Sequence, residues 1–490
     1  MKWSHCSAGA LLALALLGGC TVGPAYHPAA ALGTNAMPAA FQGAAGATNG
    51  AVWQPGQPSA HLPRGAWWQI FGDPELNRLE SLAAANNQEL AAAVARFEQA
   101  RALVNVARAD FFPHLSADPS ASRQRTSVNQ PFLGKPVGFS ATYDNFTVPL
   151  DAGWEPDLWG RIRRQVEAAR AQLAASADDT EAVKLSLQAE LATDHFTLRA
   201  QDAEYDLLQR TVTAYQLSLQ LTRNRRAGGI ASDLDVSQAE TQLRTAQAQL
   251  PAVDRSRTKL RHALATLCGQ PATGFAVAPA DVGIPGVPSI PVALPSELLE
   301  RRPDVAAAER RMAAANAAVG VAQTAFYPRL VLNGTAGLQS LDAGTLFESP
   351  SRLWAVGPSL QWPLFTGGRL RAQLAAARAS YAETVAHYRQ TVLSAFEETE
   401  DQLEAQRLLA SQLDAEEAAL AAARHTLEIA NNRYKAGLVT YLEVATAQSA
   451  ALDHERTVVE LRAERLATSV ALIRAMGGGW SSNPDIPPTS

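Results

Sequence analysis

The sequence predicts a mainly helical protein that also carries paired membrane β-strands and is built from two copies of one unit. Three observations support this fold class. Two tracts of 67 and 68 residues, 161–227 and 369–436, contain neither proline nor glycine. Segments with a hydrophobic period of two precede both tracts. Groups of residues recur in the same order about 208 to 215 positions apart, which indicates an internal duplication.

The N-terminus predicts a secretory signal over residues 1–19. Lys2 precedes an apolar run that ends at Gly18 and Gly19, and this run is too short to cross a membrane as a helix. The residues that precede Cys20 are typical of a bacterial lipobox, so we expect Cys20 to be acylated and to begin the mature chain, with 20–66 as a lipid-anchored extended segment. The alternative is an ordinary signal peptide with an incidental cysteine. Thr21 favours the outer membrane, because inner-membrane retention usually requires Asp there.

Composition excludes several classes of protein. With Cys6 in the signal and Cys20 acylated, Cys268 has no partner, so neither a disulfide framework nor a cysteine metal site is expected. The formal charge of −5, or −6 without Lys2, indicates no affinity for nucleic acid. After the signal no stretch approaches the roughly 18 to 20 apolar residues of a membrane helix. If the mature chain crosses a membrane, it does so as strands.

Three pairs of segments define the duplication, and they are 106–113 with 321–328, 160–170 with 368–378, and 229–236 with 437–444. The first copy is predicted to span 67–268 and the second 296–476. A proline-rich linker, 269–295, separates them, and 477–490 is expected to be a flexible tail.

Each copy is predicted to run as helix, strand pair, long helix, turn and helix. Leading helices are expected over 75–110 and 296–324, and returning helices over 233–267, with a kink at Pro251, and over 441–476. Each long tract would form a helix on the order of 100 Å long, which requires an elongated bundle or coiled coil. Gly228, Gly229 and Gly437 are placed to cap the long helices at their C-termini.

Four strands are expected in each chain. Apolar residues alternate with polar or small ones from Trp354 to Leu364, from Phe146 to Ala152, and more weakly from Leu330 to Leu338. The first strand, 115–125, is interrupted by Pro119. This pattern fits transmembrane strands, although a soluble sheet remains the alternative. Because four strands cannot close and an open edge is not tolerated in lipid, several chains must share one barrel. Three copies would give twelve strands and room for a pore.

Five segments together resemble the outer-membrane factor family, which comprises the TolC-like exit channels of tripartite efflux pumps. They are 20–26, 67–76, 154–161, 301–305 and 325–330, and the similarity covers nearly the whole chain. The resemblance is to the NodT-type lipoprotein branch, which serves resistance-nodulation-division pumps. It implies a homotrimer with one 12-stranded barrel in the outer membrane and a periplasmic barrel of helices. It also implies a periplasmic adaptor, an inner-membrane pump, and passive conduction of small molecules such as drugs.

The resemblance further implies two helical tips at the periplasmic end, around 226–235 and 434–443, where the adaptor docks. The residues that carry this role over are Gly229, Ile230, Ser232, Leu234, Gly437, Leu438 and Thr440. The alternative is that the glycines merely cap helices and Leu234 merely packs.

The family's gate lies early in the last helix, and this sequence departs from it there. Some relatives carry an acidic and a basic residue where Thr446 and Ser449 stand, so an ion-pair lock is not expected. Leu442 with Thr446 remains a candidate hydrophobic constriction. Asp233 and Asp235 are candidate acidic groups of the lumen, although aspartates in such turns are more often N-caps.

No enzymatic site is expected. The nine histidines are never within four residues of one another, and no zinc-protease, Walker or dinucleotide motif is present. The acidic cluster at Glu397, Glu398, Glu400 and Asp401 is interpreted as a solvated helix face. No catalytic residue, metal or cofactor is predicted apart from the lipid on Cys20. The alternatives are a type I protein-secretion channel and a lipid-anchored periplasmic coiled-coil scaffold.

Overall fold

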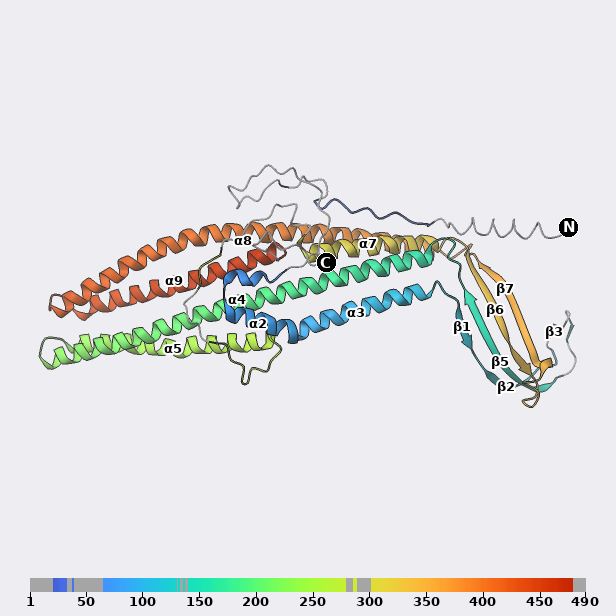
Figure 1. Ribbon diagram of the computed structural model, residues 1–490, viewed down its shortest axis with the longest axis horizontal. Helices are drawn as coiled ribbons and strands as arrows, with labels where there is room; N and C mark the ends of the chain where they lie inside the picture. The colour runs from blue at the N-terminus through green and yellow to red at the C-terminus, as the bar shows by residue number, and fades with distance from the viewer. Residues whose placement is uncertain are drawn as a thin grey trace. The chain divides into compact units, whose positions relative to one another are not determined.

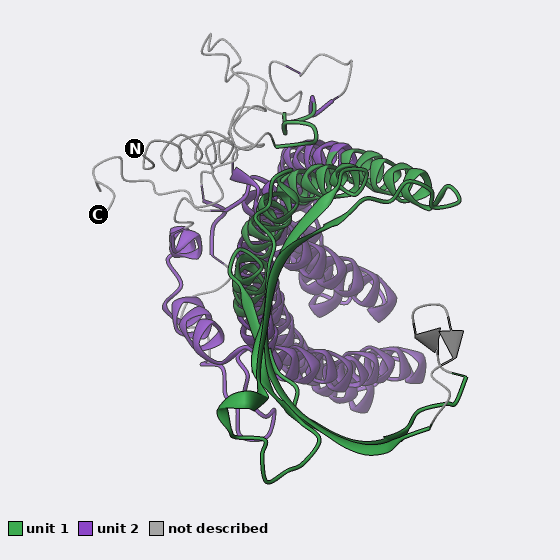
Figure 2. Ribbon diagram, turned by 90° about the vertical axis from the view of Figure 1, so that its right-hand side faces the viewer, with its two compact units in different colours: residues 1–29, 97–176, 308–388 green, residues 30–96, 177–307, 389–490 purple. Residues whose placement is uncertain are grey.

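The computed structural model describes residues 21–32, 38, 65–129, 131–132, 135–136, 140–278, 285–288 and 301–478. The predicted signal, Cys20 and residues 279–284 and 289–295 of the predicted linker lie outside these residues. Two compact units are present, coloured separately in Figure 2. Unit 1 comprises Met1–Ala29, Phe97–Ser176 and Ala308–Tyr388, and unit 2 comprises Ala30–Arg96, Ala177–Ala307 and Arg389–Ser490.

Helices dominate the described chain (Figure 1). They are η2 (Trp67–Phe71), α2 (Pro74–Asn86), α3 (Gln88–Ala109), α4 (Arg161–Ala227), α5 (Asp233–Leu267), α7 (Pro303–Thr324), α8 (Arg369–Lys435) and α9 (Tyr441–Ala475). The long helices α4 and α8 each have 67 residues, and the returning helices α5 and α9 each have 35. None of the described helices is both long and apolar enough to span a membrane.

The predicted bounds of α4 and α5 are confirmed, and α8 and α9 each end one residue earlier than predicted. The prediction of one leading helix over 75–110 is wrong, because Asn87 is extended and separates α2 from α3. Its Oδ1 accepts the Leu90 N–H at 2.9 Å, as an N-cap does, and its Nδ2 donates to Leu267 O at 2.8 Å. The second leading helix, predicted over 296–324, is α7 from Pro303, and residues 296–300 lie outside the described part of the chain. Arg302 is not helical, because the residue before a proline disfavours the helical conformation.

Unit 1 contains a curved antiparallel sheet (Figure 2). Its strands are β1 (His114–Ala117), β2 (Ser120–Arg125), β5 (Thr142–Trp154), β6 (Arg329–Ser340) and β7 (Arg352–Gln361). The order is β1-β5-β6-β7, and β2 continues the line of β1 along β5 in the same register, so Pro119 interrupts the first strand as predicted. β7 ends three residues before Leu364. A small hairpin that the sequence did not predict joins β3 (Pro131–Phe132) to β4 (Lys135–Pro136).

Side chains of residues 146–152 of β5, 330–338 of β6 and 354–360 of β7 divide between an apolar and a polar face. Val148 lies opposite Leu338, and directly opposed residues in an antiparallel pair share a face. On the other face Thr335 Oγ1 donates to Asp151 Oδ1. The predicted alternation of β5, β6 and β7 is therefore present, with one apolar and one polar face.

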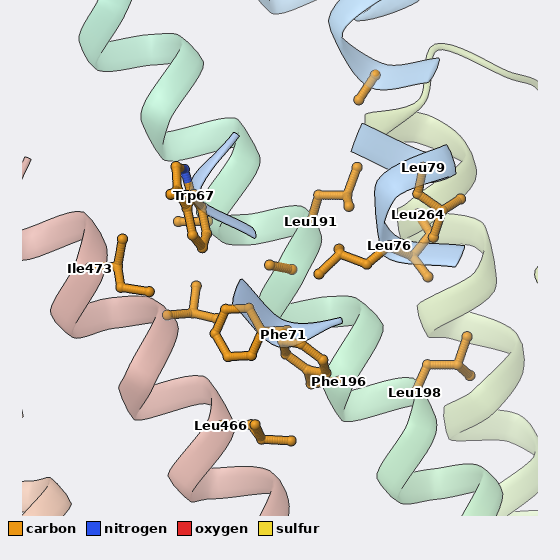
Figure 3. Packing of buried hydrophobic residues seen from close by; sticks show 14 of the residues in the cluster. Trp67, Phe71, Leu76, Leu79, Leu191, Phe196, Leu198, Leu264, Leu466 and Ile473 are labelled. Carbon is orange, nitrogen blue, oxygen red and sulfur yellow. The ribbon is translucent and has the colours of Figure 1, made fainter. Parts of the chain in front are cut away.

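The main hydrophobic core of unit 2 is formed by η2, α2, α4, α5 and α9 (Figure 3). Trp67, Leu76 and Phe196 are fully buried in it, and Trp67 Nε1 donates to Gln188 Oε1 at 3.2 Å. Beside this core, Asp73 caps α2 and contacts buried His195 Nε2 at 2.7 Å. Burial alone would raise the pKa of Asp73, but the bonds from His195 and Leu76 lower it to about 2. This histidine thus has a structural role.

Residues 21–29 of unit 1, called here the N-terminal strap, are held along α4 and α7. Arg164 donates to the carbonyls of Val22 and Gly23 at 3.3 and 3.2 Å. Tyr26 donates to buried Glu309. Gly23 has φ +111°, and a Cβ there would lie 2.6 Å from Gly320 Cα, so only glycine fits.

Candidate functional site

Two turns of unit 2, the first tip (225–235) and the second tip (433–443), contain all the predicted docking residues and the predicted gate residues Asp233, Asp235 and Leu442. The other two predicted gate residues, Thr446 and Ser449, follow the second tip in α9. Both long helices end in the same Schellman motif. Ile230 N–H donates to Arg225 O at 2.8 Å, and Leu438 N–H donates to Arg433 O at 3.0 Å. Gly229 and Gly437 have φ of +75° and +78°. The glycines therefore do cap the helices, as one interpretation of the sequence held.

Each tip presents a pair of exposed aliphatic side chains. Ile230 and Leu234 are 68% and 66% exposed in the first tip, and Leu438 and Leu442 are 70% and 56% exposed in the second. A Schellman motif is often accompanied by a hydrophobic contact of the residue that follows the glycine. Ile230 and Leu438 occupy that position, and they remain mostly exposed. Exposed apolar groups that recur at one kind of site are typical of a contact surface.

The helix that follows the first tip has its own N-cap. Ser232 Oγ accepts the Asp235 N–H at 3.2 Å, and Asp235 Oδ2 accepts the Ser232 N–H at 2.9 Å, which together form a capping box. Ser232, a predicted docking residue, is thus also a cap.

The helix that follows the second tip obtains its cap from the first tip. Thr440 makes no side-chain cap bond, and the Tyr441 N–H donates instead to Asp235 Oδ1 at 3.0 Å. Burial alone would raise the pKa of Asp235, but the bonds from Ser232 and Tyr441 hold that pKa below its ordinary value. Asp235 therefore stays ionised at neutral pH and connects the two tips.

Arg225 makes the opposite connection, at the end of α8. Its Nη1 donates to Lys435 O at 2.9 Å, and its guanidinium lies 4.9 Å from the centre of the Tyr434 ring. A carbonyl at the C-terminus of α8 that lacks a partner within the helix is thus satisfied by a side chain of α4.

Two tyrosines fill the space behind the tips. Tyr441 is fully buried, and its hydroxyl lies 3.2 Å from Ser218 Oγ and donates to Gln448 Oε1 at 3.1 Å. Its ring meets that of Tyr434 edge-on, with 5.5 Å between the centroids. Tyr434 in turn donates to Thr222 on α4 at 3.2 Å. Hydrogen bonds from buried groups to fixed partners make this packing specific.

The predicted gate residues fall into two groups. Leu442 and Thr446 are exposed and Ser449 is half-buried, and the spacing of four and three residues places them on one face of α9. Asp233 is exposed and pairs with Arg226. Both carboxylate oxygens of Asp235 accept hydrogen bonds within the tips, which agrees with the capping alternative for the aspartates, and its role in the lumen stays a prediction.

Sequence reasoning missed Arg225, Tyr434 and Tyr441. Arg225 and Asp235 contact residues that are 210 and 206 positions away, so no local pattern revealed them. The only available signal was a basic residue in the last turn of a helix, which often binds terminal carbonyls.

The described residues contain no group of three or more side chains suited to hold a metal ion. In the acidic cluster at 397–401, which was expected to be a solvated helix face, Glu398 makes an ion pair. It accepts a hydrogen bond from buried Arg302 at 2.7 Å, and Arg302 also donates to Asp304 and to Ala475 O. That cluster therefore contributes an ion pair that stabilises unit 2.

Comparison with known proteins identifies the class. The family model described as "Outer membrane efflux protein" matches residues 79–270 and 294–478. The sequence is 32% identical over 467 residues to the toluene efflux pump outer membrane protein TtgC of Pseudomonas putida, covering 95% of this chain and 94% of that protein. It is 34% identical over 418 residues to the pyoverdine export outer membrane protein OpmQ of Pseudomonas aeruginosa, covering 85% and 88%.

The structure is similar to that of the outer-membrane channel OprN, with a TM-score of 0.84 and 32% identity over 94% of this chain and 100% of that one. Fold, tips and relatives thus define an outer-membrane channel protein. The chain belongs to the outer membrane efflux protein family, which is a family of channels and not of enzymes.

Proposed function

We propose that this protein is the passive exit duct of a tripartite efflux system, conducting small molecules from the periplasm to the exterior. The observation that carries the proposal is the pair of tips, in which exposed aliphatic side chains project beyond a buried, hydrogen-bonded support. Such a surface can bind a partner while the support resists opening until the partner is bound. Conduction itself requires no catalytic residue.

The membrane part is proposed to be a homotrimer with one 12-stranded barrel. Trp354 lies on the apolar face of the sheet and Trp362 directly follows the end of β7, and they are 78% and 60% exposed. Eight residues of extended chain span about 27 Å, which is comparable with the apolar band of about 25 Å on outer-membrane barrels. Aromatic residues are enriched at both boundaries of that band. Internal duplication would give this ring a pseudo-sixfold symmetry.

The two tips are proposed to dock a periplasmic adaptor, which joins the channel to an inner-membrane pump. Ile230, Leu234 and Leu438 would contact the adaptor. Leu442, with Thr446 and Ser449 behind it, would narrow the closed channel, and Asp233 would add charge there. Acylation of Cys20 would anchor each chain in the outer membrane, leaving a long periplasmic extension.

The proposed substrates are small organic compounds, because relatives are named for toluene efflux and pyoverdine export. A type I protein-secretion channel is the alternative within the same fold. A lipid-anchored periplasmic scaffold would share the helices, but it has no need for a sheet with an apolar face.

Single-channel conductance of the purified, acylated protein in planar bilayers tests the proposal, with the oligomeric mass determined in the same detergent. We expect trimers that insert and conduct weakly. Leu442→Ala should raise the open probability, whereas the matched control Leu438→Ala should leave conductance unchanged and weaken adaptor binding. Monomers that never conduct, even with Leu442→Ala, would favour the scaffold.

A further inference from the structure

The apolar face of the sheet in unit 1 becomes charged at the end that lies away from the starts of α4 and α8. Phe146 and Ala121 are opposed on that face. Two residues further along each strand the same face carries Asp144 and Arg123, which are also opposed. Arg125 follows two residues later in β2. The apolar run of both strands therefore ends in charged side chains.

The second strand pair shows the same change. Trp354 belongs to the apolar face of β7, and two residues earlier that face carries Arg352, which lies opposite Leu338. In β6 the last apolar residue of the face is Leu338, and Ser340 follows opposite Phe146. The apolar boundary thus moves by two residues at each step from β7 to β6 and from β6 to β5. A boundary that slants in this way is expected where tilted strands cross a flat bilayer.

Three arginines, Arg123, Arg125 and Arg352, form what we call the arginine rim. Arg123 is 76% exposed, and its Nε lies 3.7 Å from Asp144 Oδ1, which is too far for a hydrogen bond. Arg125 makes one long bond, to Ser140 Oγ at 3.3 Å. Arg352 is exposed, and its guanidinium forms no hydrogen bond or ion pair with the described residues. Most donors of the rim are therefore free to bind another molecule.

The opposite face of the strands is uncharged at this end. Gln124 donates to Tyr143, and Gln339 Nε2 donates to Asn145 Oδ1 at 2.9 Å, so these side chains satisfy one another. The two carboxylates of the loop 341–351 form no ion pair with the rim within the described chain. The charges of the strands at this end are thus confined to the face that meets lipid in the proposed barrel.

The other end of the sheet, where the helices begin, is different. On the apolar face β5 ends at Trp154, and Trp362 directly follows β7. The arginine of this end, Arg329, lies on the polar face opposite Gln361 and is already paired with Glu155 at 2.6 Å. Tryptophan is typical of membrane interfaces in general, whereas unpaired arginine on the lipid face favours an anionic partner.

We propose that the arginine rim binds the phosphate groups of lipid A, the membrane anchor of lipopolysaccharide in the outer leaflet. This inference rests on the proposed channel, in which the helices lie in the periplasm and the far end of the sheet therefore reaches the outer leaflet. A guanidinium suits a phosphate because its planar fork donates two parallel hydrogen bonds to two phosphate oxygens.

The spacing of the rim fits such a headgroup. Arg123 and Arg125 stand about 7 Å apart on one face of β2, so both can contact the same lipid. Arg352 lies at the other edge of the sheet, roughly 14 Å away, and would contact a second lipid. Trp354 and Val356, each 78% exposed on the same face of β7, would meet the acyl chains below the headgroup.

Lipid binding by the purified full-length trimer tests the proposal, with diphosphoryl lipid A as the probe and bound lipid measured by native mass spectrometry. Arg123→Gln with Arg125→Gln should weaken binding roughly tenfold, because charge-assisted hydrogen bonds to phosphate are lost. Arg352→Gln alone should weaken it roughly threefold, since a single contact is removed. Conductance should not change, because the rim does not face the lumen.

The matched control is Arg170→Gln with Arg378→Gln, which removes the same charge from exposed positions on α4 and α8. It should leave the affinity for lipid A unchanged. Phosphatidylglycerol vesicles provide the other source of phosphate in this membrane. We expect the native protein to bind them more weakly than lipid A, because each headgroup offers fewer phosphate oxygens to neighbouring arginines.

Equal loss of lipid A in the rim and control variants, or no loss in either, would overturn the rim as the binding site. If phosphatidylglycerol bound as tightly as lipid A, the assignment to the outer-leaflet lipid would be wrong. Protein that neither forms trimers nor conducts would instead overturn the proposed function, and measuring mass and conductance on the same samples separates these results.

Discussion

The first and second tips contain similar sequence segments, 229–236 and 437–444, yet they are stabilised differently. The first tip caps its own returning helix through Ser232 and Asp235. The corresponding residues of the second tip are Thr440 and Glu443, and no side-chain cap bond forms there. Its two helix ends are satisfied from the first tip, by Asp235 at Tyr441 and by Arg225 at Lys435.

This difference shows where a tip can open. The turn of the first tip would keep its own cap if the tips separated, whereas the second tip would lose a partner at both of its helix ends. Unpaired terminal groups must then bind water or fray. We therefore expect the second tip, which carries Leu442, to be the mobile one.

The largest expected effect on this asymmetry is that of Asp235→Ala. It removes the capping box and the partner of the Tyr441 N–H, with a cost of about 1–3 kcal/mol to the tips. Trypsin should then cleave after Lys435 more rapidly, and conductance should rise. The matched control Glu443→Ala, at the equivalent position, should change neither. If both variants behave alike, the tips are not asymmetric.

Acid should reproduce part of that effect. Because the pKa of Asp235 is lower in the folded protein than in an unfolded chain, its contribution is fully present above the usual aspartate pKa of about 3.9. It is lost as pH falls through the lowered folded value. Below about pH 4, protection of the Tyr441 amide from hydrogen exchange, relative to an unfolded chain at the same pH, should therefore decrease in the native protein. It should not decrease further in Asp235→Ala. If protection of the Tyr441 amide already decreased near neutral pH, a titrating group other than Asp235 would be responsible.

A smaller effect is expected from Arg225→Ala, about 1 kcal/mol, because one hydrogen bond to Lys435 O and one contact with the Tyr434 ring are lost. Arg226 is the matched control, since it is adjacent and its ion pair with Asp233 is exposed. Cleavage after Lys435 should increase for Arg225→Ala alone. Similar cleavage of the two variants would show that only net charge matters.

The smallest effect is a repair of the second tip. Thr440→Asp provides a stronger N-cap residue, which should stabilise the start of α9 by about 0.5 kcal/mol. In the Asp235→Ala background it should slow cleavage after Lys435 and reduce the excess conductance. Failure to do so would mean that Asp235 acts through the first tip rather than through Tyr441.

Long-range contacts explain which parts of the structure the sequence could predict. The bounds of α4 and α5 follow from glycine, proline and capping residues close to each helix end, so they were predictable. The break at Asn87 was not, because that residue is extended partly through a bond to Leu267, 180 residues away. The residues on both sides of Asn87 are good helix formers, so the local sequence does not indicate a break there.

The site shows the same division. Leu442 and the other aliphatic tip residues were identified from the sequence, and the structure shows them exposed. The bond from Tyr441 to Asp235 was not foreseen, because an N-cap is normally local and here it comes from the other hairpin. Asp235 looked the same as Asp233 in the sequence, but only Asp235 closes the capping box with Ser232 and accepts the Tyr441 N–H.

The N-terminal strap has a practical consequence for protein engineering. Its contacts begin at Val22, whose N–H donates to Trp159 O at 3.1 Å, and they continue through Gly23 and Tyr26. A version of the protein that begins at Thr21 would keep all of them. A shorter version that also lacks Tyr26 would instead remove the hydroxyl that donates to the carboxylate of buried Glu309. Expression designs that omit Cys20 should therefore keep the strap.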